Sequence, residues 1–148
     1  NQVSFAFDNV YILSRLIEGN FPDYNKVIPP AFATVITTKT HDFMDAVERV
    51  SLLARDTDYN IIKLDFKNDC VIITSNNPDI GKASETVPIV MKGNEIEIAF
   101  NAKYVTDILK NITSEELIFS LNTPLSPASI KPTDDLTYNY IITPVRIN

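Results

Sequence analysis

Hydrophobic and polar residues alternate along residues 33–148 in a pattern that predicts the same order of elements twice. Each run consists of a strand, a helix and three further strands. The strands are expected at 33–38, 60–67, 70–75 and 83–91 in the first run, and at 95–100, 116–121, 128–132 and 138–147 in the second. The helices are expected at 41–55 and, after a cap at Asn101, through residue 112. Such a duplication predicts an α+β fold in which two helices pack on one side of antiparallel sheets.

The first 30 residues follow a different pattern and end in a stiff connector. Alternating apolar residues predict strands over 2–8 and 11–17. The segment SRLIEGNFPDYNKVIPP, residues 14–30, then suits neither a helix nor a strand. Its final pair, Pro29 and Pro30, lacks backbone donors and holds the preceding residue extended, so no helix or central strand can pass through it. We therefore expect a domain boundary at the end of this segment.

The first predicted helix has an apolar stripe and one leucine that does not belong to it. The stripe is expected to face the core and consists of Phe43, Ala46, Val47, Val50 and Ala54. Leu52 falls on the opposite side among charged residues and is expected to be exposed, and Leu53 lies at the edge of the stripe. A single exposed leucine is common on protein surfaces. An apolar residue surrounded by charges is also typical of a subunit interface, and both interpretations stay open here.

The second predicted helix places two lysines away from its core stripe. The stripe consists of Val105, Ile108, Leu109 and Ile112. Lys103 and Lys110, seven residues apart, share the far side. Lysines in such a position usually form a solvated surface, but they also suit contact with phosphates that does not depend on base sequence.

Composition narrows the class of protein. The 148 residues carry a net charge of −6, from 13 Lys and Arg against 19 Asp and Glu. This balance argues against nucleic-acid binding through bulk positive charge, although it leaves a local basic strip possible. No apolar run approaches the roughly 20 residues that cross a bilayer, and no signal peptide is visible, so a soluble protein is expected. The single cysteine, Cys70, excludes an internal disulfide and a cysteine-based zinc site, favours a reducing intracellular environment, and is expected among buried apolar residues.

Residues suited to catalysis are few. His41 is the only histidine, and three glycines leave no Gly-rich phosphate loop. Asp134 and Asp135 lie in a predicted turn, where carboxylates commonly bond their own backbone. The sequence therefore predicts a binding module without catalytic residues, metal or cofactor. The alternative is a small-ligand-binding or hydrolytic domain in which His41 acts together with Asp134 and Asp135.

Three segments resemble the family of bacterial DNA polymerase III β subunits, the sliding clamps. They are SRLIEGNFPDYNKVIP, IAFNAKYVTDILKNI and YNYIITPVRIN, in this order along the chain. The resemblance implies the DNA-clamp fold and a subunit longer than this chain, in keeping with the absence of an initial Met. Residues 1–28 are then expected to be the end of the clamp's middle domain with the interdomain connector, and residues 29–148 the C-terminal domain.

The resemblance also implies the function. Clamps of this family are non-catalytic processivity factors that form a homodimeric ring around duplex DNA without reading its sequence. Short peptides of DNA polymerase III α subunit, the clamp loader and repair polymerases bind to them. A cytoplasmic, nucleoid-associated protein is therefore expected.

Specific residues correspond to the family's peptide groove. They are Pro22, Val27, Tyr104, Pro127, Ile141, Thr143, Pro144, Val145 and Arg146. Thr143 stands where the family commonly has Met, which predicts a less deformable and slightly more polar groove. From the residues alone, the closing segment has an ordinary alternative, a strand with Tyr138, Tyr140 and Ile142 in the core.

Two further surfaces follow from the resemblance. Leu52 and Leu53 are expected to close the ring against a partner subunit. Arg49, Lys103 and Lys110 are expected to face DNA.

Overall fold

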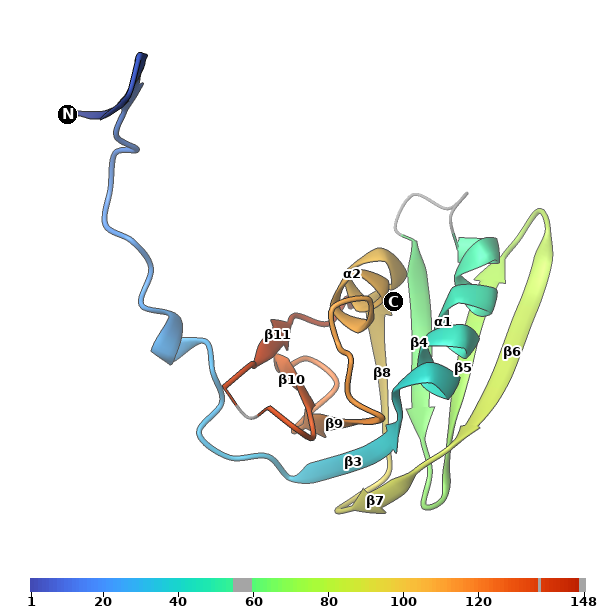
Figure 1. Cartoon of the computed structure of the whole chain (residues 1–148). Coiled ribbons are helices and arrows are strands. Elements are labelled where there is room, and N and C mark those ends of the chain that lie inside the picture. Colours follow the sequence, from blue (N-terminus) through green and yellow to red (C-terminus); the bar gives the residue numbers. More distant parts are fainter. Residues whose placement is uncertain (55–59, 136, 147–148) are drawn as a thin grey trace.

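The computed structural model describes residues 1–54, 60–135 and 137–146 (Figure 1). Two α-helices form within these ranges, α1 (Thr40–Ala54) and α2 (Ala102–Leu109). The strands are β1 (Gln2–Phe7), β2 (Val10–Arg15), β3 (Thr34–Lys39), β4 (Ile61–Phe66), β5 (Cys70–Asn77), β6 (Gly81–Pro88), β7 (Val90–Lys92), β8 (Ile96–Asn101), β9 (Glu116–Leu121), β10 (Ala128–Pro132) and β11 (Tyr140–Ile142). A short 3-10 helix, η1, covers Tyr24–Lys26.

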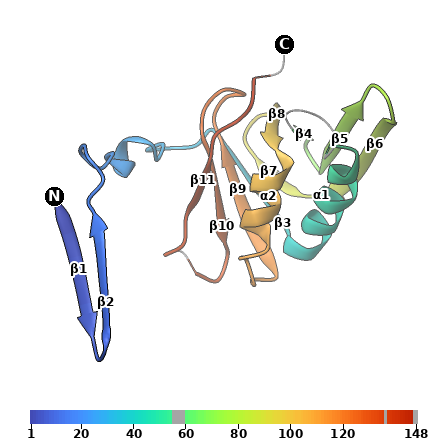
Figure 2. The same cartoon turned by 90° about the horizontal axis from the view of Figure 1, so that it is seen from above.

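Two antiparallel sheets carry the helices on one side. The five-stranded sheet has the order β11-β10-β9-β3-β7, and the four-stranded sheet has the order β6-β5-β4-β8. Each sheet contains strands from both sequence repeats, because β3 pairs with β9 and β4 pairs with β8. Figure 2 shows α1 and α2 side by side in front of the strands, and the two helices contact each other. The predicted α+β arrangement, with two helices on antiparallel sheets, is confirmed.

The predicted strand at 83–91 is wrong in one respect, because it forms two strands in different sheets. β6 pairs with β5, whereas β7 pairs with β3. The change of sheet occurs at Ile89, whose N–H donates to the carbonyl of Asp69. Pro88 has no N–H to continue a ladder, so the chain can leave the first sheet there.

The last strand and the second helix are shorter than predicted. Within the described residues β11 contains only Tyr140–Ile142, whereas a strand was predicted over 138–147, of which residue 147 lies outside the described residues. α2 ends at Leu109 rather than at residue 112. The β11 ladder stops where Pro127 would face Thr143, one position beyond the pair of Ala128 and Ile142, since proline cannot donate a ladder hydrogen bond. The predicted cap of α2 is confirmed, because the Asn101 side chain accepts from the N–H of Lys103.

The core lies between the helices and the sheets and is centred on Phe119 of β9. This residue is 1% exposed. The centroid of its ring lies 5.5 Å from the ring centroid of Phe66, 5.8 Å from that of Phe100 and 6.2 Å from that of Phe43. The four rings come from both sheets and from α1. The predicted core stripe of α1 is buried throughout. In the predicted core stripe of the second helix, Val105, Leu109 and Ile112 are buried and Ile108 is partly buried.

Predicted core positions outside the helices are partly wrong. Tyr138 is 56% exposed and Tyr140 is half-buried, so only Ile142 of that expected face is buried. The two tyrosine rings instead stack on each other, with centroids 6.4 Å apart. Cys70 is half-buried at the exposed start of β5. Partial burial, aided by the neighbouring Asp69, raises the pKa of its thiol, which makes the thiol less reactive.

Gly93 joins β7 to β8 at a close approach between backbone segments. Its φ is +118°, and a Cβ there would lie 2.2 Å from the carbonyl oxygen of Ala33. Beside it, the Thr34 hydroxyl bonds the backbone carbonyl of Asn94 at 2.8 Å. Only glycine fits this conformation in this space.

The N-terminal hairpin stands apart from both sheets. Among the strands that the structure describes, β1 and β2 pair only with each other, and both views show a long connector between them and β3 (Figures 1 and 2). Large apolar side chains, including Phe5, Phe7, Tyr11 and Leu13, are about half exposed or more. The two predicted strands are confirmed, but their side chains contribute nothing to the core.

Candidate functional site

The C-terminal segment connects the two sheets. β11 is one edge strand of the five-stranded sheet, and β8 is one edge strand of the four-stranded sheet. After β11 the chain crosses to β8, where the N–H of Val145 donates to the carbonyl of Ala99 at 2.8 Å. This bond holds the end of the described chain against the edge of the four-stranded sheet.

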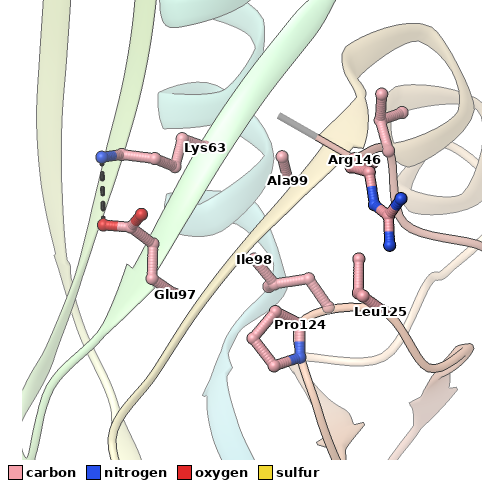
Figure 3. A pocket seen from close by; sticks show the side chains of 8 residues that line it. Lys63, Glu97, Ile98, Ala99, Pro124, Leu125 and Arg146 are labelled. Atoms are coloured by element: carbon pink, nitrogen blue, oxygen red, sulfur yellow. Dashed lines mark ion pairs between the residues drawn. The ribbon is translucent and has the colours of Figure 1, made fainter. Parts of the chain in front are cut away.

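A cavity of about 140 Å³ lies beside this crossing (Figure 3). Its lining consists of Lys63, Glu97, Ile98, Ala99, Pro124, Leu125, Val145 and Arg146. Figure 3 shows Ile98, Pro124 and Leu125 gathered near Arg146, while the Lys63–Glu97 ion pair, 3.0 Å long, lies at the other end. An apolar anchor and a polar or acidic group could be held there together.

Only part of the predicted groove lines this cavity. Val145 and Arg146 belong to it, and Arg146 is exposed. The other predicted groove residues lie outside the lining of this cavity. Tyr104 and Thr143 are exposed, and Pro22 and Val27 are exposed on the connector. Pro127, Ile141 and Pro144 are half-buried.

Sequence reasoning missed the wall that faces Arg146. Pro124 and Leu125 lie in the β9–β10 loop, and Ile98 and Ala99 lie in β8. Leu125 could have been noticed, because an apolar residue within the turn-forming segment NTPLSP has no strand or helix to bury it. It is 56% exposed.

The connector has defined local structure at its FPDY motif. The Asp23 side chain accepts from the N–H of Asn25 at 3.1 Å and caps η1, and the N–H of Val27 donates to the carbonyl of Tyr24 at 3.0 Å. Proline at position 22 restricts the backbone just before this turn. Val27, 48% exposed, is thus presented from a fixed turn.

The predicted cationic residues on the helices are exposed, and each lies near a carboxylate. Lys103 Nζ is 2.7 Å from Asp107 Oδ2, and this pair raises the pKa of Lys103. Lys110 Nζ is 4.0 Å from a carboxylate oxygen of Glu48, which joins α2 to α1. The remaining cation, Arg49, makes its contacts elsewhere.

Arg49 points from α1 toward the edge strand β6. Its guanidinium donates to both carboxylate oxygens of Glu85, at 3.0 and 3.3 Å, and lies 3.9 Å from Asp45. These hydrogen bonds and the opposite charge lower the pKa of Glu85. Arg49 is therefore on the flank of α1 that faces β6, away from α2.

The leucines at the end of α1 differ in exposure. Leu52 is 56% exposed, as predicted, and Leu53 is half-buried. The side chain of Asn77 donates to the carbonyl of Leu53 at 3.3 Å and ties the end of α1 to β5.

The alternative catalytic pair is not favoured. His41 is exposed, and its Nδ1 lies 3.6 Å from Asp45 and 3.9 Å from Asp42. The cavity that His41 lines includes neither Asp134 nor Asp135. Asp135 instead accepts hydrogen bonds from the N–H and hydroxyl of Thr137, which lower its pKa.

Among residues 1–54, 60–135 and 137–146, no group of three or more His, Cys, Asp or Glu side chains could hold a metal ion. None of the helices in these ranges combines the length and apolar character needed to span a membrane.

The paired sheets, the two helices and the docked tail are those of a DNA clamp domain. Residues 25–146 match the family model of the DNA polymerase III beta subunit, C-terminal domain, and the chain belongs to this family. The predicted resemblance is confirmed.

The relatives are longer proteins. The beta sliding clamp of Staphylococcus epidermidis is 36% identical over 147 residues, which are 99% of this chain and 39% of that protein. The DNA polymerase III beta subunit of Thermotoga maritima superposes with a TM-score of 0.88 at 30% identity, over 99% of this chain and 40% of the other. The sliding clamp of Bacillus subtilis gives a TM-score of 0.86 at 38% identity, over 99% and 39%. The chain thus spans about two fifths of the length of these relatives.

Proposed function

We propose that this chain is the C-terminal portion of a sliding-clamp subunit, a non-catalytic processivity factor of DNA replication in the bacterial cytoplasm. Residues 1–28 are assigned to the end of the middle domain with the connector, and residues 29–148 to the C-terminal domain. The observation that carries this proposal is the match to clamp structures over 99% of the chain, hairpin included. The exposed apolar side chains of the hairpin also suit a segment that packs against further clamp sequence.

In this proposal the tail, the connector and the β9–β10 loop form one side of a peptide groove. Val145 and Leu125 supply apolar surface for an aliphatic or aromatic anchor, and Arg146 supplies a charged donor for a polar group or carboxylate. Val27 extends the apolar surface from the connector. The proposed occupants are short peptides of the DNA polymerase III α subunit, the clamp loader and repair polymerases.

The remaining surfaces complete the proposed ring. Lys103 and Lys110 lie on the exposed side of α2 and would meet the phosphates of duplex DNA without reading bases. Arg49 would contribute less, since its guanidinium is held by Glu85. Leu52 and Leu53 would meet the partner subunit of a homodimer.

The groove is tested by peptide binding to the full-length subunit. A short Gln/Leu/Phe-type peptide carrying a fluorophore is titrated by anisotropy. Val27→Asp places a charge on the apolar wall and Arg146→Ala removes the donor, so each should weaken binding at least about fivefold, the effect of losing a significant interface contact.

Matched variants separate this effect from general damage. Val90→Asp changes a valine on the edge strand β7 that is more exposed than Val27, 68% against 48%, and Arg49→Ala removes an arginine on α1, so neither should alter peptide affinity. If Val27→Asp and Arg146→Ala bind the peptide like the unaltered protein, the groove is wrongly placed. The 148-residue chain should bind more weakly than the full-length subunit, because it lacks the opposite wall.

A further inference from the structure

The outer surface of the two helices is not basic. The helices and the C-cap Lys110 carry four carboxylates, Asp42, Asp45, Glu48 and Asp107, against three permanent cations, Arg49, Lys103 and Lys110. With His41 neutral, this surface has a slight excess of negative charge. A surface that holds duplex DNA through its lysines alone would not be expected to carry so many acidic groups.

The acidic groups are placed against the lysines. Asp107 lies one turn after Lys103 on α2 and accepts a hydrogen bond from its ammonium at 2.7 Å. Glu48 reaches from α1 toward Lys110, at 4.0 Å. All four side chains are exposed by 44% to 68%, so both pairs lie at the surface where a phosphate would approach.

We propose that Asp107 and Glu48 restrain the contact between this surface and duplex DNA. This inference rests on the proposed function, in which Lys103 and Lys110 face the DNA. A phosphate that approaches either lysine must compete with a carboxylate already beside it, and it is repelled by that carboxylate. The DNA is therefore held weakly, although lysines are present.

The restraint has a physical consequence for movement along DNA. A weak, sequence-independent contact lets the protein exchange one phosphate for the next, whereas several unpaired lysines would bind each position more tightly. Asp107 and Glu48 would thus set how tightly the ring holds the duplex, while the ring itself prevents loss of the DNA.

The test measures affinity of the full-length subunit for a short labelled duplex by anisotropy, between about 50 and 200 mM salt. The variants are Glu48→Gln, Asp107→Asn and the pair combined. Freeing one lysine should add at most one phosphate contact. This contact would steepen the slope of log affinity against log salt by about 0.9, so binding at 50 mM should strengthen about 3.5-fold relative to binding at 200 mM. The combined variant should show up to twice this change in slope.

Asp65→Asn is the matched control. Asp65 also pairs with a lysine, Lys67, at 3.1 Å. It lies on the face of β4 opposite to Leu64 and Phe66, which are buried beneath the helices. The substitution changes net charge by the same amount as each single carboxylate variant, but on the face of β4 turned away from the helices, so DNA affinity should stay the same.

The lysine variants separate failure of this inference from failure of the proposed function. Lys103→Ala combined with Lys110→Ala should weaken DNA binding and flatten the salt dependence. If the lysine variant weakens binding but the carboxylate variants behave like Asp65→Asn, the restraint is refuted and the DNA-facing assignment stands. If the lysine variant has no effect, the DNA-facing assignment fails and the inference fails with it. Thermal unfolding of each variant confirms that these exposed substitutions leave the fold intact.

Discussion

Phe119 is predicted to be the side chain whose loss costs the most stability, because it joins both sheets to α1. Its ring is 1% exposed and lies within 6.2 Å of three other aromatic rings. Removing a buried phenylalanine side chain costs about 3–5 kcal/mol through lost burial and the cavity left behind. Aromatic pairs contribute about 0.5–1.5 kcal/mol each beyond burial, so Phe119→Ala should lie near the upper end, at about 4–5 kcal/mol. That loss is a large part of the roughly 5–15 kcal/mol that stabilises a folded protein.

The assay is equilibrium urea unfolding of the chain, followed by circular dichroism. Phe119→Leu retains part of the apolar volume and should cost only about 1–2 kcal/mol, so it keeps the prediction testable if the alanine variant does not fold. Phe21→Ala removes the same side chain where it is 87% exposed and should change stability by less than about 0.5 kcal/mol. A cost below about 2 kcal/mol for Phe119→Ala would refute the central role of this ring.

Three further predictions concern the backbone, the proposed ring and one ion pair. Gly93→Ala should destabilise the chain by more than about 2 kcal/mol in urea, because the new Cβ meets backbone at a positive φ, and a smaller loss would contradict the close approach. Changing Leu52 and Leu53 to Glu should convert the proposed full-length dimer to monomers in sedimentation, and an unchanged dimer would exclude them from the interface. NMR titration should place the pKa of Glu85 below the usual value, and Arg49→Gln should raise it. Because this pKa is lowered on folding, the pair stabilises the fold above about pH 4.3, and the stabilisation is lost as pH falls through the lowered pKa. If the titration midpoint of Glu85 were the same in Arg49→Gln as in the unaltered chain, the ion pair would be refuted.

The order of helices and strands was predictable because a helix or strand that buries one side has apolar residues at regular intervals in the sequence. The stripe of α1 and the alternation of β4 belong to elements with one face against the core. The errors occurred where the pattern of apolar residues fits more than one arrangement of strands. The pattern of residues 83–91, in which Ser84, Glu85 and Thr86 precede an apolar stretch, does not reveal that the chain leaves one sheet at Pro88 and enters another.

The candidate groove was predicted mainly through resemblance, and the structure added residues distant in sequence. Arg146 and Val145 were expected, but Leu125 and Ile98 line the same cavity only because the tail crosses to β8. Likewise, Lys110 was expected on the exposed side of the second helix, and Glu48 lies near it because α1 and α2 pack side by side.

Local periodicity and motifs were enough to predict where helices and strands form and which family the chain resembles. The exposure of Tyr138 and Tyr140, the loop that faces the tail and the ion pairs between elements could not be predicted, because they depend on contacts between residues far apart in the chain. Asp107 and Lys103 lie one helical turn apart, so their pairing was readable in principle, whereas the partners Glu85 and Arg49 met only when β6 packed beside α1.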